Sequence, residues 1–138
     1  MKYKGEDIKR LIPQRYPMLM VDEFEAVAEN VAQTVLYVRT DNLFILPDGT
    51  LAETGLIEHI AQSAAALAGC QSSSEGQPRI GLIGEVKHFE RHRRPKAGEC
   101  VHTRVEFGFS FGNVTLVQGQ VSVDGEEIAS AQLKIFMQ

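Results

Sequence analysis

Hydrophobic and polar residues alternate along several segments of the chain, most regularly over residues 99–111. One set of alternate positions there is largely apolar and consists of Val101, Thr103, Val105, Phe107 and Phe109. The other set is polar and consists of His102, Arg104, Glu106 and Ser110. A period of two is typical of an antiparallel strand with one buried face. We therefore expect a strand in which the first set of side chains, Phe109 included, all point the same way.

Other segments share the β-branched and aromatic content of strands. They are residues 17–27, 31–39, 79–92, 114–123 and 126–138. Gly112-Asn113 precedes the fourth of these segments, and Asp124-Gly125 separates the last two. An Asp-Gly pair between two such segments is a strong short-range hairpin signal. The C-terminal part of the chain is therefore predicted to form an antiparallel meander.

Two segments have helical spacing instead. Residues 6–12 place Ile8, Leu11 and Ile12 on one face of a short amphipathic helix. Residues 55–69, GLIEHIAQSAAALAG, are predicted to form the main helix and carry small side chains on several faces. Small side chains let neighbouring backbone approach closely, as a helix wrapped by a curved sheet requires. The high helix propensity of alanine is the alternative explanation.

The remaining segments are predicted to be connections within one domain. Residues 41–53 contain the turn-forming sequence Pro47-Asp48-Gly49, and residues 70–78, CQSSSEGQP, have the composition of a loop. A length of 138 residues fits one domain of ordinary size. We expect a single α+β domain over residues 1–138, with a sheet covering one long helix.

Composition and charge exclude several classes of function. The chain is 43% hydrophobic with a formal net charge of −4, so its overall charge gives no indication of nucleic-acid binding. Cys70 and Cys100 lack the spacing of a metal site, and we expect both to be reduced. No apolar run approaches the ~20 residues of a membrane helix. These features predict a cytoplasmic protein that binds neither membrane nor metal.

Three segments, IKRLIPQRYPMLMVDEF, IEHIAQSAAALAG and GEVKHFERHRRPKAGE, resemble motifs of the 3-hydroxyacyl-acyl-carrier-protein dehydratases of the hot-dog fold. IKRLIPQRYPMLMVDEF is similar to the family's N-terminal motif, with Gln14 in place of its histidine. IEHIAQSAAALAG is similar to its central helix, and GEVKHFERHRRPKAGE to a strand that ends in a Pro-x-x-Gly turn. The resemblance implies a hot-dog fold, in which a long antiparallel sheet curls around one helix. It also implies a homodimer, or a heterodimer with another hot-dog chain.

The resemblance assigns candidate roles to residues of the main helix. Glu58 matches the catalytic acid of the family, and Gln62 follows it by one helical turn, within reach of its carboxyl group. Gln62 and Gly55 are candidate substrate-binding residues. Backbone N–H groups at the start of the helix are suited to stabilising an enolate-like thioester oxygen. The alternative is that Glu58 is a first-turn carboxylate favoured by the helix dipole.

The sequence departs from the family at the general base. The family's histidine precedes the helix, whereas residues 42–55, NLFILPDGTLAETG, are shorter than the family's loop and contain no histidine. This departure resembles a divergent branch, the dehydratase-like subunits of aryl polyene biosynthesis. His59 and His88 are the weak candidates for a base within the chain, and His92 and His102 are weaker still. A partner chain that supplies the histidine is the other possibility.

A local basic cluster is the candidate docking site for the acidic acyl carrier protein. It consists of Arg91, Arg93, Arg94 and Lys96. A local patch is enough to attract a partner of opposite charge, although a solvated strand end explains the cluster equally well. We expect no cofactor beyond the phosphopantetheine thioester of the substrate. A hot-dog acyl thioesterase and a non-catalytic subunit that binds acyl chains or a partner remain alternatives to dehydration.

Overall fold

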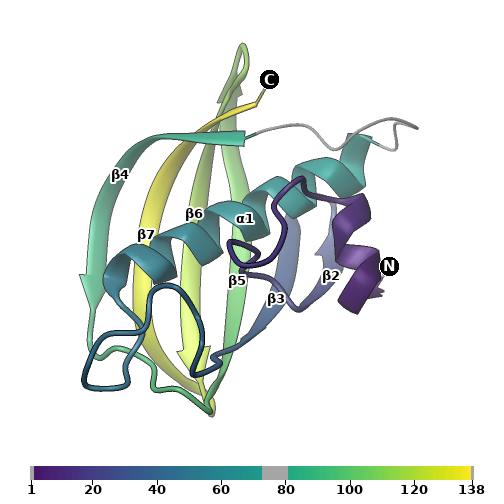
Figure 1. Cartoon of the computed structure of the whole chain (residues 1–138). Helices are drawn as coiled ribbons and strands as arrows, with labels where there is room; N and C mark the ends of the chain where they lie inside the picture. The colour runs from purple at the N-terminus through teal and green to yellow at the C-terminus, as the bar shows by residue number, and fades with distance from the viewer. Residues whose placement is uncertain (1, 73–80, 138) are drawn as a thin grey trace.

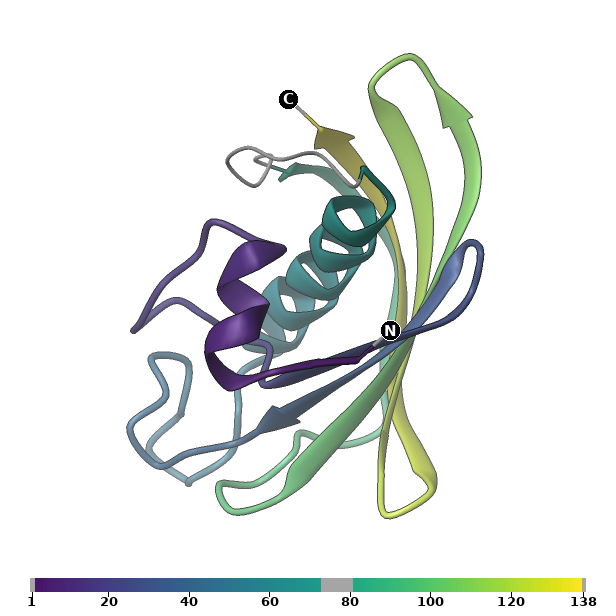
Figure 2. The ribbon, with the colours of Figure 1, turned by 90° about the vertical axis from the view of Figure 1, so that its right-hand side faces the viewer.

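A curved antiparallel sheet with one long helix across one face forms the architecture of the chain (Figures 1 and 2). The computed structural model describes residues 2–72 and 81–137. The sheet has seven strands in the order β1-β2-β3-β5-β6-β7-β4. The strands are β1 (Lys2–Lys4), β2 (Glu23–Ala28), β3 (Val31–Tyr37), β4 (Gly81–Arg91), β5 (Cys100–Phe111), β6 (Val114–Val123) and β7 (Glu126–Met137). The helices are the 3-10 helix η1 (Gly5–Arg10) and α1 (Glu53–Ser72).

The C-terminal meander forms as its pattern predicts. β5, β6 and β7 pair in sequence order, and β4, which follows the helix, returns beside β7 at the edge of the sheet. Asp124 and Gly125 both have positive φ angles, of 52° and 82°. Two positive φ angles are what a tight turn needs to match the twist of its strands, so the predicted hairpin is confirmed.

The alternation in β5 holds only for the first part of the strand. Val101, Thr103 and Val105 are buried beneath the helix as predicted. The register between β5 and β6 then shifts between Phe107 and Ser110, and Phe109 is 69% exposed. A β-bulge inserts a residue on one strand and changes which side chains share a face. The expectation that Phe109 faces the core with Val105 is therefore wrong.

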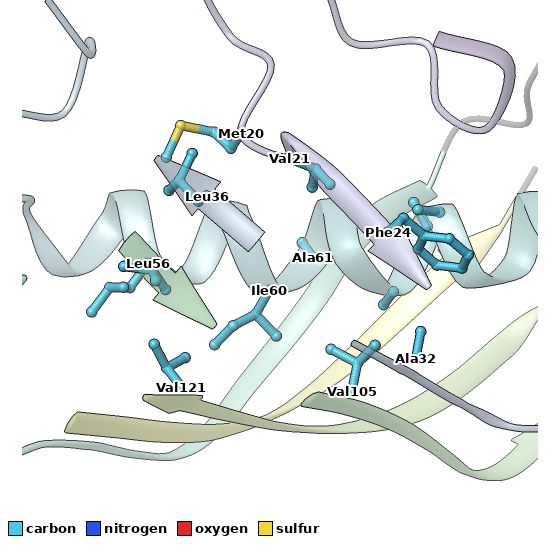
Figure 3. Packing of buried hydrophobic residues seen from close by; sticks show 14 of the residues in the cluster. Met20, Val21, Phe24, Ala32, Leu36, Leu56, Ile60, Ala61, Val105 and Val121 are labelled. Carbon is cyan, nitrogen blue, oxygen red and sulfur yellow. The ribbon is translucent and has the colours of Figure 1, made fainter. Parts of the chain in front are cut away.

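The main helix is enclosed on several sides, which confirms the prediction of a wrapped helix. Figure 3 shows Ile60 pointing from α1 toward Val105 and Val121 of the sheet, and all three side chains are buried. Gly119 of β6 lies against Ile60, so that a Cβ atom at position 119 would be 2.7 Å from its Cγ2 atom. On another side, the N-terminal segment contacts Gly69, where a Cβ atom would lie 2.3 Å from the carbonyl oxygen of Leu11.

Several element boundaries differ from the prediction. The N-terminal helix is a 3-10 helix, Gly5–Arg10, although Ile8, Leu11 and Ile12 are buried together as expected. The strand predicted over residues 17–27 begins only at Glu23. The loop predicted over residues 70–78 starts inside α1, which continues to Ser72, and residues 73–78 lie outside the described residues. Within the part of the chain that the structure describes, no helix has the length and hydropathy of a membrane-spanning segment.

The contact at Gly69 predicts a large effect of a small substitution. Gly69→Ala would place a methyl group against the backbone of Leu11, and backbone cannot move aside as a flexible side chain can. We expect the free energy of unfolding to fall by about 1–3 kcal/mol, the usual cost of overpacking, as measured by urea denaturation. Gly108→Ala is the matched control, because its nearest neighbour, the carbonyl oxygen of Leu116, is 3.8 Å away. Equal stability of the two variants would contradict the close packing of α1.

Candidate active site

Glu58 and Gln62 form the centre of the candidate site on one side of α1. The Nε2 group of Gln62 donates hydrogen bonds to Oε2 of Glu58 (2.7 Å) and to the carbonyl oxygen of Met18 (2.8 Å). Its Oε1 atom accepts the backbone N–H of Met20 at 2.6 Å. Gln62 is fully buried, whereas Glu58 is half-buried. The amide therefore has one orientation, and it holds one carboxyl oxygen of Glu58 in place.

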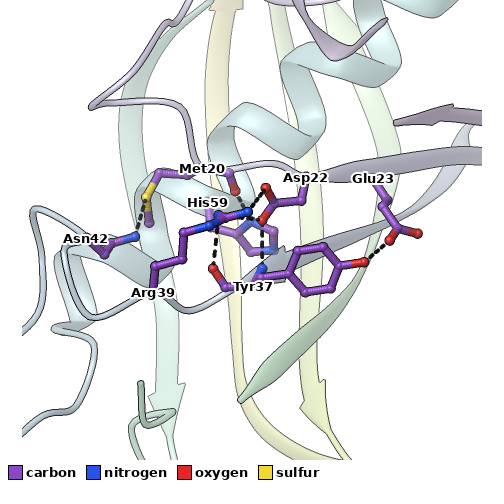
Figure 4. Close-up of polar contacts among 7 residues, drawn as sticks. All are labelled: Met20, Asp22, Glu23, Tyr37, Arg39, Asn42 and His59. Atoms are coloured by element: carbon purple, nitrogen blue, oxygen red, sulfur yellow. Dashed lines mark hydrogen bonds and ion pairs between the residues drawn. The ribbon is translucent and has the colours of Figure 1, made fainter. Parts of the chain in front are cut away.

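His59 lies next to Glu58 in sequence but points into the core. Its Nδ1 atom is 2.7 Å from the carbonyl oxygen of Met20 (Figure 4). Its Nε2 atom is 2.8 Å from Oγ1 of Thr103. A carbonyl oxygen only accepts hydrogen bonds, so Nδ1 carries the proton and Nε2 accepts the hydroxyl of Thr103. Complete burial lowers the pKa of His59 to about 4. The imidazole is thus neutral at pH 7, with both nitrogens engaged away from any substrate.

His59 and Gln62 together hold the segment that precedes β2. His59 donates a hydrogen bond to the carbonyl oxygen of Met20, and Gln62 accepts one from the N–H group of Met20. At the end of the segment the carboxylate of Asp22 accepts the backbone N–H of Tyr37 at 2.7 Å and pairs with Arg39 at 3.1 Å (Figure 4). Residues 17–22 therefore cover α1 instead of extending β2. The sequence signal for this segment is the motif RYPMLMVD, which the hydrophobic pattern alone mistakes for a strand.

Gly55 contributes close packing in this structure. Its N–H group donates to the carbonyl oxygen of Ala52 at 2.9 Å. A Cβ atom at this position would lie 2.7 Å from Cβ of Phe44, which belongs to the loop before the helix. The N–H of Gly55 is therefore already used, and its role in substrate binding stays a prediction. The glycine allows the loop to pack directly on the first turn of α1.

The other histidines lie apart from the Glu58–Gln62 pair. His88 is exposed, has a φ angle of 52°, and lies in β4 where its register with β7 shifts between Lys87 and Glu90. His92 is exposed after β4, and His102 is exposed on the sheet face opposite α1. Among the hydrogen bonds of the described residues, none joins a histidine to Glu58. The structure thus brings Glu58 and Gln62 together and leaves His88 elsewhere.

The basic cluster is largely paired within the chain. Arg91 and Arg94 both bind Oε2 of Glu53, at 2.6 and 2.9 Å, and this ties the end of β4 to the first turn of α1. Arg93 donates two hydrogen bonds to Glu99, at 2.9 and 3.1 Å, and holds the pKa of that carboxyl below its usual value. These arginines have a structural function. Carrier-protein binding by Arg91, Arg93, Arg94 and Lys96 stays a prediction.

Comparison with known proteins identifies the family. The sequence profile of the ApeP-like family, described as ApeP dehydratase, matches residues 6–138. The chain belongs to the ApeP-like dehydratase family. This ApeP-like chain is 29% identical over 131 residues to the 3-hydroxyacyl-[acyl-carrier-protein] dehydratase FabZ of Natranaerobius thermophilus, with 92% of each chain covered. It is 26% identical over 138 residues to the FabZ of Bacillus subtilis, with 93% of each covered.

Solved structures confirm the expected hot-dog fold. A chain of the dehydratase heterocomplex ApeI:P from Xenorhabdus doucetiae superimposes with a TM-score of 0.85 at 17% identity, covering 95% of this chain and 90% of that one. A hypothetical thioesterase from Streptococcus pneumoniae superimposes with a TM-score of 0.66 at 10% identity, covering 83% and 84%. These similarities concern the fold. The described residues of the ApeP-like chain contain no group of three or more His, Cys, Asp or Glu side chains that could hold a metal ion.

Proposed function

We propose that this ApeP-like chain is the acid-bearing subunit of a dehydratase for 3-hydroxyacyl thioesters of acyl carrier protein. The observation that carries the proposal is the fixed carboxyl group of Glu58. Gln62 donates to Oε2 of Glu58, so in the protonated acid the proton sits on Oε1. That oxygen is the one left to donate to a substrate hydroxyl.

The reaction divides between this carboxyl group and a base. The base removes a proton from C2 of the acyl chain, and the electrons of that C–H bond form the C2–C3 double bond. The C3–O bond breaks, and Glu58 gives its proton to the departing hydroxyl, which leaves as water. The products are a trans-2-enoyl thioester and water. Before the next turnover the base releases its proton to solvent and Glu58 takes one up.

A partner chain is the proposed source of the base. The loop before α1 has no histidine, and His59 is buried with both ring nitrogens bonded. β4 at the sheet edge is exposed along most of its length. Ile83 and Val86, 39% and 38% exposed, pair with the buried residues Ile135 and Leu133 and so share their face of the sheet. An apolar edge on the helix side suits another hot-dog chain, and the structure from Xenorhabdus doucetiae is itself described as a dehydratase heterocomplex.

Turnover with and without a partner tests this proposal. We would give a 3-hydroxyacyl carrier-protein thioester to the chain alone, and to the chain mixed with each separate subunit of the Xenorhabdus doucetiae complex. Mass spectrometry would identify the products. We expect an enoyl thioester only from a mixture in which the partner carries a loop histidine, and Val86→Lys in β4 should abolish it.

The same assay distinguishes the alternatives. Full-rate dehydration by the chain alone would contradict the need for a partner's base. Release of free acid and thiol would indicate a thioesterase, in which a carboxylate activates water for attack on the thioester. Tight acyl binding without turnover in any mixture would indicate a non-catalytic subunit.

A further inference from the structure

An exposed apolar patch lies on the face of the sheet opposite α1. We call it the outer apolar patch, and its members come from four adjacent strands: Leu82 of β4, Phe109 and Phe111 of β5, Leu116 of β6 and Phe136 of β7. Phe111 is 73% exposed, Phe109 69% and Leu82 50%. The β5–β6 hairpin carries the two phenylalanines. It extends beyond the end of α1 and lies apart from that helix (Figure 2). Exposed apolar patches of this kind mark interaction surfaces.

The strand register shows that the patch is continuous. Leu82 pairs with Phe136, Phe136 with Val114, and Val114 with Phe111. Directly paired residues of antiparallel strands point to the same face of a sheet. Ile135, next to Phe136, is buried beneath the helix, so this row of side chains points outward.

Two irregularities in the strands build the patch. In β4 the register shifts between Ile83 and Glu85, and the ring of Phe136 lies over the inserted Gly84. A Cβ atom on Gly84 would be 2.1 Å from Cε1 of that ring. In β5 the bulge between Phe107 and Ser110 breaks the alternation that would have placed Phe109 with the core residues. The bulge in β5 thus places Phe109 on the outer face, and Gly84 leaves room there for the ring of Phe136.

The charges beside the patch are of both signs. Glu85 pairs with Lys134 at 3.0 Å and with Lys87 at 3.7 Å, and Arg104 pairs with Glu106 at 3.0 Å. A hollow of about 520 Å³ is lined by Lys87, Glu106, Leu116 and Lys134 among other residues. A strongly acidic or basic partner would meet like charges on such a surface. A surface that bears both signs can face a copy of itself without net repulsion, which is what a self-complementary interface requires.

We propose that the outer apolar patch packs against the same patch of a second copy of this chain. The two sheets then lie face to face, with the phenylalanines of both hairpins between them. This contact uses the face opposite α1 and leaves the β4 edge free. A dehydratase assembly would therefore contain two partner pairs joined through the outer faces of this subunit.

The mass of the chain in solution tests the interface separately from the proposed function. Val86→Lys first disables pairing at the β4 edge, so any remaining association must use another surface. We expect sedimentation velocity to show two chains for Val86→Lys, and one chain when Phe109→Ser and Phe111→Ser are added. The control is Val27→Ser added to Val86→Lys, which replaces a 46% exposed residue of β2 outside the patch. This variant should still show two chains.

Three results would overturn the inference. They are a single-chain mass for Val86→Lys alone, an unchanged mass after the phenylalanine substitutions, or the same loss of mass in the Val27→Ser control. Binding of the single-chain form of Val86→Lys to phosphatidylglycerol vesicles, lost with the two phenylalanines, would assign the patch to a lipid surface instead. Equal melting temperatures would show that the variants fold. The Phe109→Ser/Phe111→Ser protein with an intact β4 edge should have the same turnover as the wild-type chain in the same mixture.

Discussion

Glu58→Gln is expected to lower dehydration of a 3-hydroxyacyl thioester by about 100- to 10,000-fold in the assembled enzyme, the usual contribution of a positioned general acid. Glutamine keeps the size of the side chain, and its amide oxygen still accepts the hydrogen bond from Gln62. The variant loses only the proton that the departing hydroxyl needs. Turnover rates from the mass-spectrometric assay, measured at saturating substrate, provide the comparison.

A matched substitution separates the acid from a general change of charge. Glu29→Gln removes a carboxylate from the exposed turn between β2 and β3, and we expect it to leave turnover unchanged. Because α1 begins at Glu53, Glu58 lies beyond the first turn, and the alternative of a first-turn carboxylate is wrong. Wild-type turnover by Glu58→Gln would show that the carboxylate has no chemical role. The dehydratase mechanism would then need another acid.

His59→Leu is expected to lower the free energy of unfolding by about 2–4 kcal/mol at pH 7. The substitution leaves the carbonyl oxygen of Met20 and the hydroxyl of Thr103 buried without the imidazole, and an unsatisfied buried polar group costs about 1–3 kcal/mol. His59→Asn should lose less, because its side-chain N–H group is placed to donate to Met20 as Nδ1 does. Urea denaturation of the three proteins measures the difference.

The pH dependence of stability gives a second test of His59. Its pKa is about 4 in the folded chain against an ordinary value of 6.5, so between these values the unfolded chain binds more protons. The contribution to stability is therefore complete above pH 6.5 and is lost as the pH falls toward 4, by roughly 3 kcal/mol. Between pH 7 and pH 4.5 the wild-type protein should lose this contribution to its free energy of unfolding, and His59→Leu should not.

The difference between the two proteins isolates His59, because other titrating groups contribute to both. Parallel pH profiles of stability for wild type and His59→Leu would contradict a buried neutral imidazole. Loss of turnover by His59→Asn with unchanged stability would instead return His59 to the candidates for the base. The tautomer adds an independent readout, since nitrogen chemical shifts should show the proton on Nδ1.

The sequence alone determined those features that depend on neighbours close along the chain. Alternation predicted β5 as far as Phe107, which packs against the core. Asp124-Gly125 predicted its hairpin, because side-chain direction and turn conformation follow from local backbone geometry. The small residues of α1 predicted a wrapped helix for the same reason, since the space they leave is a property of each side chain. The family motif placed Glu58 one helical turn from Gln62, and a hydrogen bond joins them in the structure.

Only the tertiary structure decided the features that depend on residues far apart in the sequence. The direction of Phe109 depends on the register of β6, where the bulge appears only once the strands pair. His59 acquires its role from Met20 and Thr103, 39 and 44 residues away. The arginines at the end of β4 and just after it are structural because Glu53 and Glu99 lie within reach of them. The periodicity of the sequence indicates which face of an element is buried. The hydrogen-bond partner of a buried polar group depends on how the elements pack against one another.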